Sequence, residues 1–157
     1  FFGQSGPGRT GIWNAGWRLE VTNAGNVGIG TAAPDQKLTV NGGASKPGGG
    51  SWSVFSDRRL KTLDGDFVRG LDEIMQLDPV YYHYKAGNKP GLPTDKQYIG
   101  LVAQDVQKVI PEAVETNGSG QLMLNNDPII WAMLNSIKEL KAENDALKAR
   151  VGEIEAK

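Results

Sequence analysis

Ser56 and Lys61 stand five residues apart in the stretch Val-Phe-Ser-Asp-Arg-Arg-Leu-Lys, residues 54–61. A serine hydroxyl becomes a nucleophile when a base removes its proton, and a lysine amine is such a base when burial or neighbouring positive charge lowers its pKa. Arg58 and Arg59 lie between the two residues and supply positive charge. The spacing therefore fits a Ser–Lys pair, but Ser56-Asp57 as a turn or helix cap explains the same residues.

Most other chemistries lack the residues that they need. The chain has no cysteine, which excludes thiolate metal sites and cysteine nucleophiles, and its one histidine, His83, cannot form a multi-histidine site. Residues 25–30 loosely resemble a phosphate loop, but no helix follows them. We expect neither a metal nor another cofactor. A net charge of -1 argues against nucleic acid as a partner, and no apolar run approaches the roughly 18 residues of a membrane-inserted helix.

The glycines divide the chain at about one third of its length. Of the 21 glycines, 13 lie in residues 1–55, where short apolar stretches alternate with glycine turns and predict strands at 17–22, 26–30 and 37–41. Such strands bury few apolar side chains, whereas ordering each backbone residue costs about 1–2 kcal/mol. We interpret residues 1–55 as a Gly-rich, all-β stalk segment and linker, intertwined with other chains. The alternative, a disordered arm, conflicts with three tryptophans: Trp13, Trp17 and Trp52.

Residues 56–126 carry the signals of a compact α+β domain of small strands and helices. Apolar residues at helical spacing over 66–77 predict a helix, with Asp64 or Asp66 as its cap and Pro79 as its stop. His83 reads as a packed strand residue rather than a catalytic base. The other predicted elements are strands at 80–84 and 97–102, a short helix at 103–109, and a hairpin of 113–116 with 121–124 around an Asn-Gly-Ser-Gly turn.

Residues 127–157 repeat apolar side chains at alternating spacings of three and four, the a and d positions of a coiled coil. With Asp127 as cap and Pro128 at the first position, a helix of roughly 42 Å would be too long to lie across so small a domain. We expect it to project and to associate with copies of itself. Asn144 at an a position favours parallel register, and Glu143 at g attracts Lys148 at e between chains. The seam positions are Ile130, Met133, Ile137, Leu140, Asn144, Leu147, Val151 and Ile154.

The order of these motifs resembles the C-terminal intramolecular chaperone domains of phage tailspikes, tail fibres and endosialidases, which also end some bacterial fibre proteins. The resemblance lies in Ser-Asp-Arg-Arg-Leu-Lys at 56–61, in Leu-Asp-Glu-Ile-Met-Gln-Leu-Asp-Pro-Val-Tyr-Tyr at 71–82, in Gly-Leu-Val-Ala-Gln-Asp-Val-Gln-Lys-Val-Ile-Pro-Glu-Ala-Val at 100–114 and in the terminal coiled coil. Residues 25–42 also resemble the repeat that precedes such domains in trimeric fibres.

The resemblance implies a homotrimer in which residues 56–157 align three chains and direct the folding of the β-rich stalk. It implies a location in a virion tail fibre or tailspike, or alternatively in a bacterial surface fibre. Many members of the family then cut the peptide bond before the motif serine, as single-turnover autoproteolytic serine peptidases. On this chain the bond lies between Phe55 and Ser56, with Ser56 as nucleophile, Lys61 as general base and Asp57 orienting the pair.

Three alternatives remain open from the residues alone. The chain could be an uncleaved structural or adhesive fibre tip whose stalk binds a cell-surface glycan or receptor through Trp13, Trp17 or Trp52. It could be a dimeric coiled-coil scaffold, since β-branched a residues with leucine at d favour two chains. The last helix could also fold back on its own domain.

Overall fold

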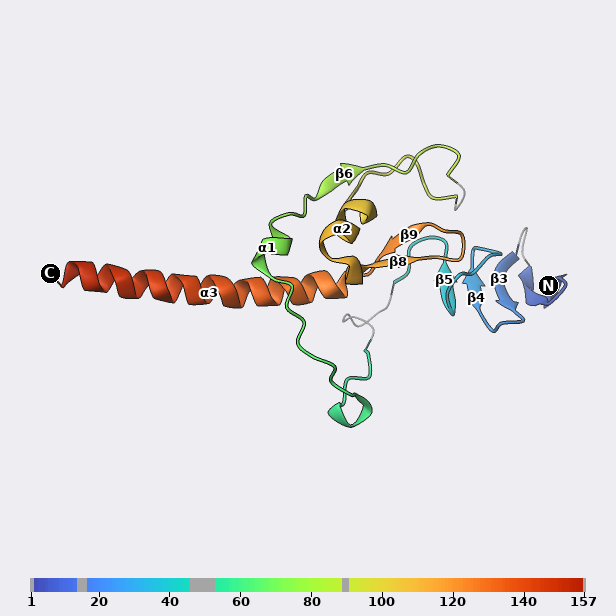
Figure 1. Ribbon diagram of the computed structural model, residues 1–157. Coiled ribbons are helices and arrows are strands. Elements are labelled where there is room, and N and C mark those ends of the chain that lie inside the picture. The colour runs from blue at the N-terminus through green and yellow to red at the C-terminus, as the bar shows by residue number, and fades with distance from the viewer. Residues whose placement is uncertain (1, 14–16, 46–52, 89–90, 157) are drawn as a thin grey trace. The chain divides into compact units, whose positions relative to one another are not determined.

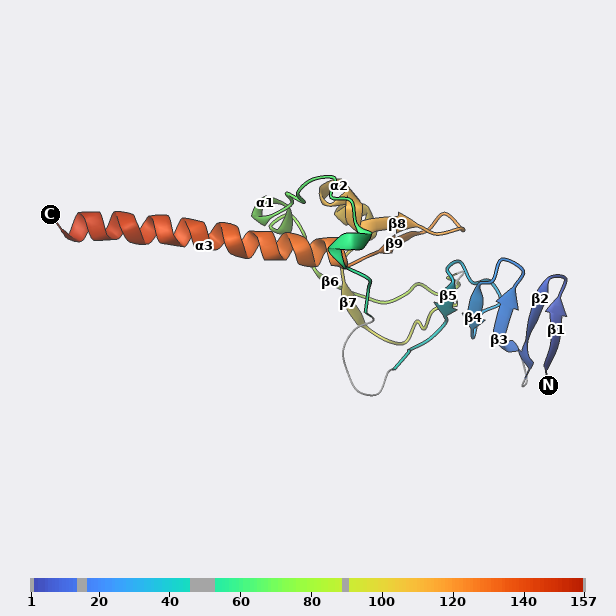
Figure 2. The same cartoon turned by 90° about the horizontal axis from the view of Figure 1, so that it is seen from below.

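The computed structural model describes residues 2–13, 17–45, 53–88 and 91–156, which Figures 1 and 2 show from two sides. The chain divides into two compact units. The first consists of Phe1–Asp57 with Tyr84–Thr94, and the second of Arg58–His83 with Asp95–Lys157. The division falls between Asp57 and Arg58, inside the stretch that carries the predicted Ser–Lys pair.

The first unit holds one five-stranded sheet with the strand order β1-β2-β3-β4-β5. The pairs are antiparallel except for β4 with β5, which is parallel. The strands predicted at 17–22, 26–30 and 37–41 correspond to β3, β4 and β5, whereas β1 and β2 carry no strand signal that we could read, because glycine and polar residues interrupt them. The bounds are Phe2–Gly6, Arg9–Trp13, Trp17–Thr22, Val27–Ile29 and Leu38–Val40.

This sheet leaves several of its large apolar side chains exposed. Ile12, Val21, Ile29 and Leu38 are exposed, while the buried charged side chain is that of Glu20. Glu20 stands in register with Gly11 on β2 and Gly28 on β4, two residues without side chains, and its carboxylate lies 4.0 Å from the Arg9 guanidinium. A single copy of the sheet thus buries little apolar surface, which is the feature that leads us to predict an intertwined stalk.

The second unit combines short helices, two hairpin-like ribbons and one long helix. Strand β6 pairs with β7 and β8 pairs with β9, both antiparallel. Helix α2 has the predicted bounds, and the predicted hairpin is present as β8 and β9. The elements are η1 (Arg58–Leu60), α1 (Leu71–Ile74), β6 (Val80–Tyr82), β7 (Tyr98–Gly100), α2 (Ala103–Val109), η2 (Pro111–Ala113), β8 (Val114–Thr116), β9 (Leu122–Leu124) and α3 (Asp127–Glu155).

The core of the second unit is small and lies where α2, η2 and the start of α3 meet. Val106, Ile110, Ala113 and Ala132 are fully buried there. Half-buried apolar residues from the neighbouring elements pack around them: Ile74, Leu77, Leu101, Val109, Val114, Leu124 and Ile129. The first turns of α3 therefore belong to the compact unit, and the rest of the helix extends beyond α1 and α2 (Figures 1 and 2).

Helix α1 is much shorter than the predicted helix over 66–77. The Asn135 side-chain amide donates hydrogen bonds to the carbonyls of Phe67 at 2.8 Å and Arg69 at 2.9 Å, so these residues bind to α3 instead of forming a helical turn. The cap is Gly70, and not Asp64 or Asp66. The sequence showed the apolar spacing but not this contact with a residue 66 positions later.

Helix α3 begins at Asp127, with Asn126 in the cap position rather than Asp127. The Asp127 N–H donates to the Asn125 side-chain oxygen at 3.1 Å, which satisfies one of the backbone donors at this helix end. The mixture of strands and helices confirms the predicted α+β class. The homotrimer, the coiled coil and the intertwined stalk stay predictions.

Candidate functional site

The stretch that carries Ser56 and Lys61 lies on the surface. Residues 53–57 have no regular structure, and η1 follows as a single turn in which the Lys61 N–H donates to the Arg58 carbonyl at 3.2 Å. Every residue from 53 to 68 is exposed, and the Phe55 side chain is 93% exposed. The bond between Phe55 and Ser56 is thus accessible in one chain.

The predicted catalytic residues come from both units. Ser56 and Asp57 end the first stretch of the first unit, and Lys61 belongs to the second unit. All three are exposed. Pairing of the Ser56 hydroxyl with the Lys61 amine stays a prediction.

A polar cluster that begins at Arg69 directly follows the exposed residues 53–68 and holds this end of the stretch on the second unit. The Arg69 guanidinium lies 3.3 Å from the Glu112 carboxylate and 3.4 Å from that of Glu73. Glu73 also accepts the Gly70 N–H at 2.9 Å, and Glu139 of α3 accepts the Leu71 N–H at 2.7 Å. The cluster fixes α1 on α3, so that the Ser–Lys stretch leaves the unit from a defined point.

The cluster shifts the pKa of two of its members. Hydrogen bonding and attraction to the Glu112 carboxylate raise the pKa of Arg69, with Glu73 adding to both effects. The hydrogen bond from the Gly70 N–H lowers the pKa of Glu73, and Arg69 lowers it further. Our reading of the sequence did not single out these residues. Gly70 followed three residues later by Glu73 was the available signal, because Glu at this position commonly caps a helix start.

The predicted seam residues lie along one side of α3 and are exposed in the single chain. They are Ile130, Met133, Ile137, Leu140, Asn144, Leu147, Val151 and Ile154. From residue 137 to residue 156 no side chain of this helix is buried. Along this length α1 contacts the helix through Glu139, while the apolar stripe of the helix stays exposed.

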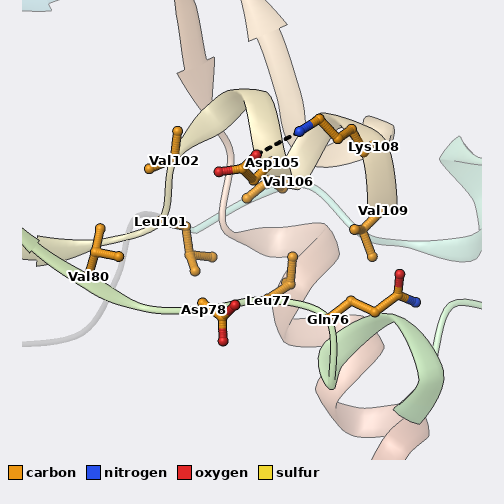
Figure 3. A pocket seen from close by; sticks show the side chains of 10 residues that line it. All are labelled: Gln76, Leu77, Asp78, Val80, Leu101, Val102, Asp105, Val106, Lys108 and Val109. Carbon is orange, nitrogen blue, oxygen red and sulfur yellow. Dashed lines mark hydrogen bonds and ion pairs between the residues drawn. The ribbon is translucent and has the colours of Figure 1, made fainter.

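A cavity of about 390 Å³ lies between α2 and the segment that joins α1 to β6 (Figure 3). Its wall combines apolar side chains such as Leu101 and Val106 with Asp78, Asp105 and Lys108. Lys108 donates a hydrogen bond of 2.8 Å to Asp105, as the dashed line in Figure 3 shows. The lining holds no serine, threonine or histidine, and Lys108 is engaged with Asp105.

Three other expectations concern binding. Within the described residues no three histidine or acidic side chains gather in a way that could hold a metal ion. No described helix has the length and apolar character that crossing a membrane requires. The side chains of Trp13 and Trp17, and Trp52 as a whole, lie outside the described residues, so their predicted contact with a glycan stays a prediction.

Comparison with known proteins bears on the exposed stretch and the unit that follows it. Residues 56–115 match the family described as chaperone of endosialidase, and the match starts at Ser56. Two curated relatives are long tail fibre proteins Gp37. That of Enterobacteria phage Ox2 is 28% identical over 146 residues, which is 86% of this chain and 58% of the relative. That of Enterobacteria phage M1 is 31% identical over 109 residues, which is 65% of this chain and 43% of the relative.

A third relative comes from outside the phages. Myelin gene regulatory factor-like A of Dictyostelium discoideum is 28% identical over 165 residues, which is 92% of this chain and 17% of that protein. The chain spans about half the length of the two tail fibre relatives. The family match and the tail fibre relatives confirm the resemblance read from the order of sequence motifs. Residues 56–115 are a chaperone-of-endosialidase domain of the kind found in phage tail fibres.

Proposed function

We propose that residues 56–157 form an intramolecular chaperone that brings three copies of the chain together and directs the folding of a β-rich tail fibre. The observation that carries this proposal is the family match over residues 56–115. The tail fibre relatives support a virion tail fibre as the location of the chain. The exposed apolar stripe of α3 supports self-association, because about 25 cal/mol is gained for each Å² of apolar surface that copies bury.

The chaperone role follows from a register problem in the stalk. Glycine-rich strands specify their pairing weakly, and the first unit of one chain buries little apolar surface. A domain that associates first would hold three stalk segments at a local concentration in the millimolar range and would align their starting points. The stalk then folds from a fixed register.

We also propose that the domain releases itself by cutting the bond between Phe55 and Ser56. Lys61 takes the proton of the Ser56 hydroxyl, and the oxygen attacks the Phe55 carbonyl carbon. Lys61 then gives that proton to the Ser56 nitrogen, which leaves as a free amine when the C–N bond breaks. Water then hydrolyses the resulting ester between the Phe55 carbonyl and the Ser56 oxygen. Because attacker and target are neighbours in one chain, proximity supplies much of the acceleration. Asp57 orients the pair.

Intact-mass analysis and light scattering on one sample test both proposals. We expect a light-scattering mass of three times 16.9 kDa before cleavage, and a fragment beginning at Ser56 after prolonged incubation. Ser56→Ala and Lys61→Ala should each abolish the fragment and leave the trimer unchanged. A monomer would contradict the assembly role. An uncut trimer would contradict self-cleavage alone and would favour a permanent fibre tip.

A further inference from the structure

Helix α3 carries a second exposed apolar surface beside the predicted seam. The side chains of Trp131 and Leu134 are 54% and 44% exposed, although neither is an a or d residue. In the heptad that runs through the seam, Trp131 takes position b and Leu134 takes position e, so the two share one flank of the helix. We call Trp131 and Leu134 the outer flank.

The opposite flank of the same turns is already occupied by the chain's own compact unit. Ala132, at position c, is fully buried, and Ser136, at position g, is 5% exposed. Ile129, the preceding g residue, is half-buried against the core. Along residues 129–136 the compact unit therefore lies next to the g positions of its own helix. In a coiled coil, the e positions of a neighbouring helix face these g positions.

The chemistry of positions e and g changes beyond Ser136, the last buried residue of the helix. Beyond Ser136 the g residues are Glu143 and Arg150, both exposed, and the matching e residues are Lys148 and Glu155. In a parallel arrangement each g residue meets the e residue five positions later on the next chain. Glu143 then meets Lys148, and Arg150 meets Glu155, so that both pairs have opposite charges.

An antiparallel pairing of two α3 helices over the same length would bring unfavourable residue pairs together. Pairing Ile130 with Ile154 would set the Asn144 amide against the apolar Leu140 side chain and would bring Lys141 of one chain near Lys148 of the other. A buried amide without a partner and two close ammonium groups both cost free energy. The parallel register instead sets Asn144 beside Asn144 of the next copy and Ile129 beside Leu134.

We propose that in the assembled protein the compact unit of one copy covers the outer flank of the next copy's α3. The occupant of the flank is thus a second copy of this chain, and the chaperone domains contact one another around the helices. The outer flank is apolar at the level of the buried Ala132 and Ser136, whereas the e residues farther along the helix, beyond the last buried residue, are charged. This inference rests on the proposed self-association and specifies its second interface.

Cysteine cross-linking tests the interface, because the chain has no cysteine of its own. The double variant Ile129→Cys/Leu134→Cys, treated with a short bifunctional maleimide, should give a covalent species of three times 16.9 kDa on a denaturing gel. Each single variant should remain uncross-linked. The matched control Ile129→Cys/Ala149→Cys, with its second thiol at an outward f position, should also stay monomeric on the gel.

Light scattering on the same samples separates the two hypotheses. A trimer that does not cross-link would overturn this inference and leave the assembly proposal intact. A monomer would overturn both.

A second variant covers the case in which the double variant misfolds. Leu134→Lys adds a charge to the outer flank without touching the a and d residues, and its helix content can be checked by circular dichroism. We expect the concentration at which the oligomer dissociates to rise roughly tenfold or more, because an apolar contact is lost and a charge must be desolvated. Ala142→Lys, at an outward f position, should leave that concentration unchanged. Equal dissociation of the two variants would overturn the inference.

Discussion

Glu139 on α3 contacts the start of α1 at Gly70, where a side chain would meet the Glu139 carboxylate. Its carboxylate accepts the Leu71 N–H at 2.7 Å and lies directly where a side chain on Gly70 would begin. The glycine thus allows α3 to supply an acceptor to the first turn of α1, whose N–H groups have no partner within the helix. Sequence reasoning treats Gly70 as an ordinary residue inside a helix, whereas its role comes from a contact across the fold.

We predict that Gly70→Ala lowers the free energy of unfolding by about 1–2 kcal/mol, because the new methyl group displaces the Glu139 carboxylate from the Leu71 N–H. Chemical denaturation checks this value. Gly152→Ala is the matched control: Gly152 lies in α3 with open space around it, so alanine should leave stability unchanged or raise it by about 0.5–1 kcal/mol. Equal effects of the two variants would contradict the proposed role of Glu139.

The lowered pKa of Glu73 predicts a loss of stability in acid. The hydrogen bond from the Gly70 N–H and the Arg69 guanidinium both favour the charged carboxylate, so the folded protein holds its proton less tightly than the unfolded chain, whose reference value is 4.5. This contribution is present above pH 4.5 and is lost as the pH falls through the folded pKa. Arg69 has a raised pKa, so its contribution is fully present across the acidic and neutral range and is lost only at strongly alkaline pH.

The free energy of unfolding of Glu73→Gln, measured between about pH 7 and pH 3, tests whether the Glu73 charge stabilises the folded protein. The variant should lose less stability than the original protein on acidification, since glutamine has no proton to gain. Parallel curves for the two proteins would count against a role of the Glu73 charge.

At the scale of elements, the β8–β9 hairpin depends on its turn more than on its strands, since each strand has three residues. The Asn117 side-chain oxygen accepts the N–H groups of Ser119 at 3.0 Å and Gln121 at 2.9 Å, and Gly120 adopts a φ of +78° that glycine tolerates best. The hairpin packs Val114 and Leu124 on the core, so the turn affects the whole unit.

We predict that Asn117→Ala costs about 1 kcal/mol of unfolding free energy, because two backbone donors lose their acceptor. Ser119→Ala, which removes a hydroxyl from the same turn and keeps its N–H, is the control and should change stability little. Hydrogen exchange of the Gln121 amide should quicken in the first variant only. Unaltered exchange would show that the turn does not need the asparagine.

The elements also show how far sequence patterns reach. The bounds of α2 and the β8–β9 pairing follow from local signals, namely apolar spacing before Pro111 and a turn of asparagine and glycine. The bounds of α1 do not follow from local signals, because the Asn135 amide donates hydrogen bonds to the carbonyls of Phe67 and Arg69, which therefore stay outside the helix. The parallel pairing of β4 with β5 likewise has no local signal, since it joins strands on either side of an irregular loop.

At the scale of the whole molecule, the seam of α3 holds one polar residue among apolar ones. We predict that Asn144→Ile raises the melting temperature of the oligomer and makes its chain number less uniform, because the amide fixes register at a cost in stability. Light scattering with thermal unfolding measures both effects. Ala146→Ile places the same side chain at the c position outside the seam and should change neither. A variant with lower melting temperature would place Asn144 outside a helix–helix interface.

The sequence by itself determined the class of the domain and the signals of chemistry and assembly. The order of short motifs led to the chaperone-of-endosialidase family, and the heptad pattern led to a long helix, because both depend on residues close together in the chain. Only the tertiary structure decided which flank of α3 its own unit covers, leaving Trp131 and Leu134 exposed, and where the Ser56–Lys61 stretch is anchored. These contacts join residues far apart in the chain, 66 and 68 positions for the Asn135 hydrogen bonds, so local spacing does not predict them.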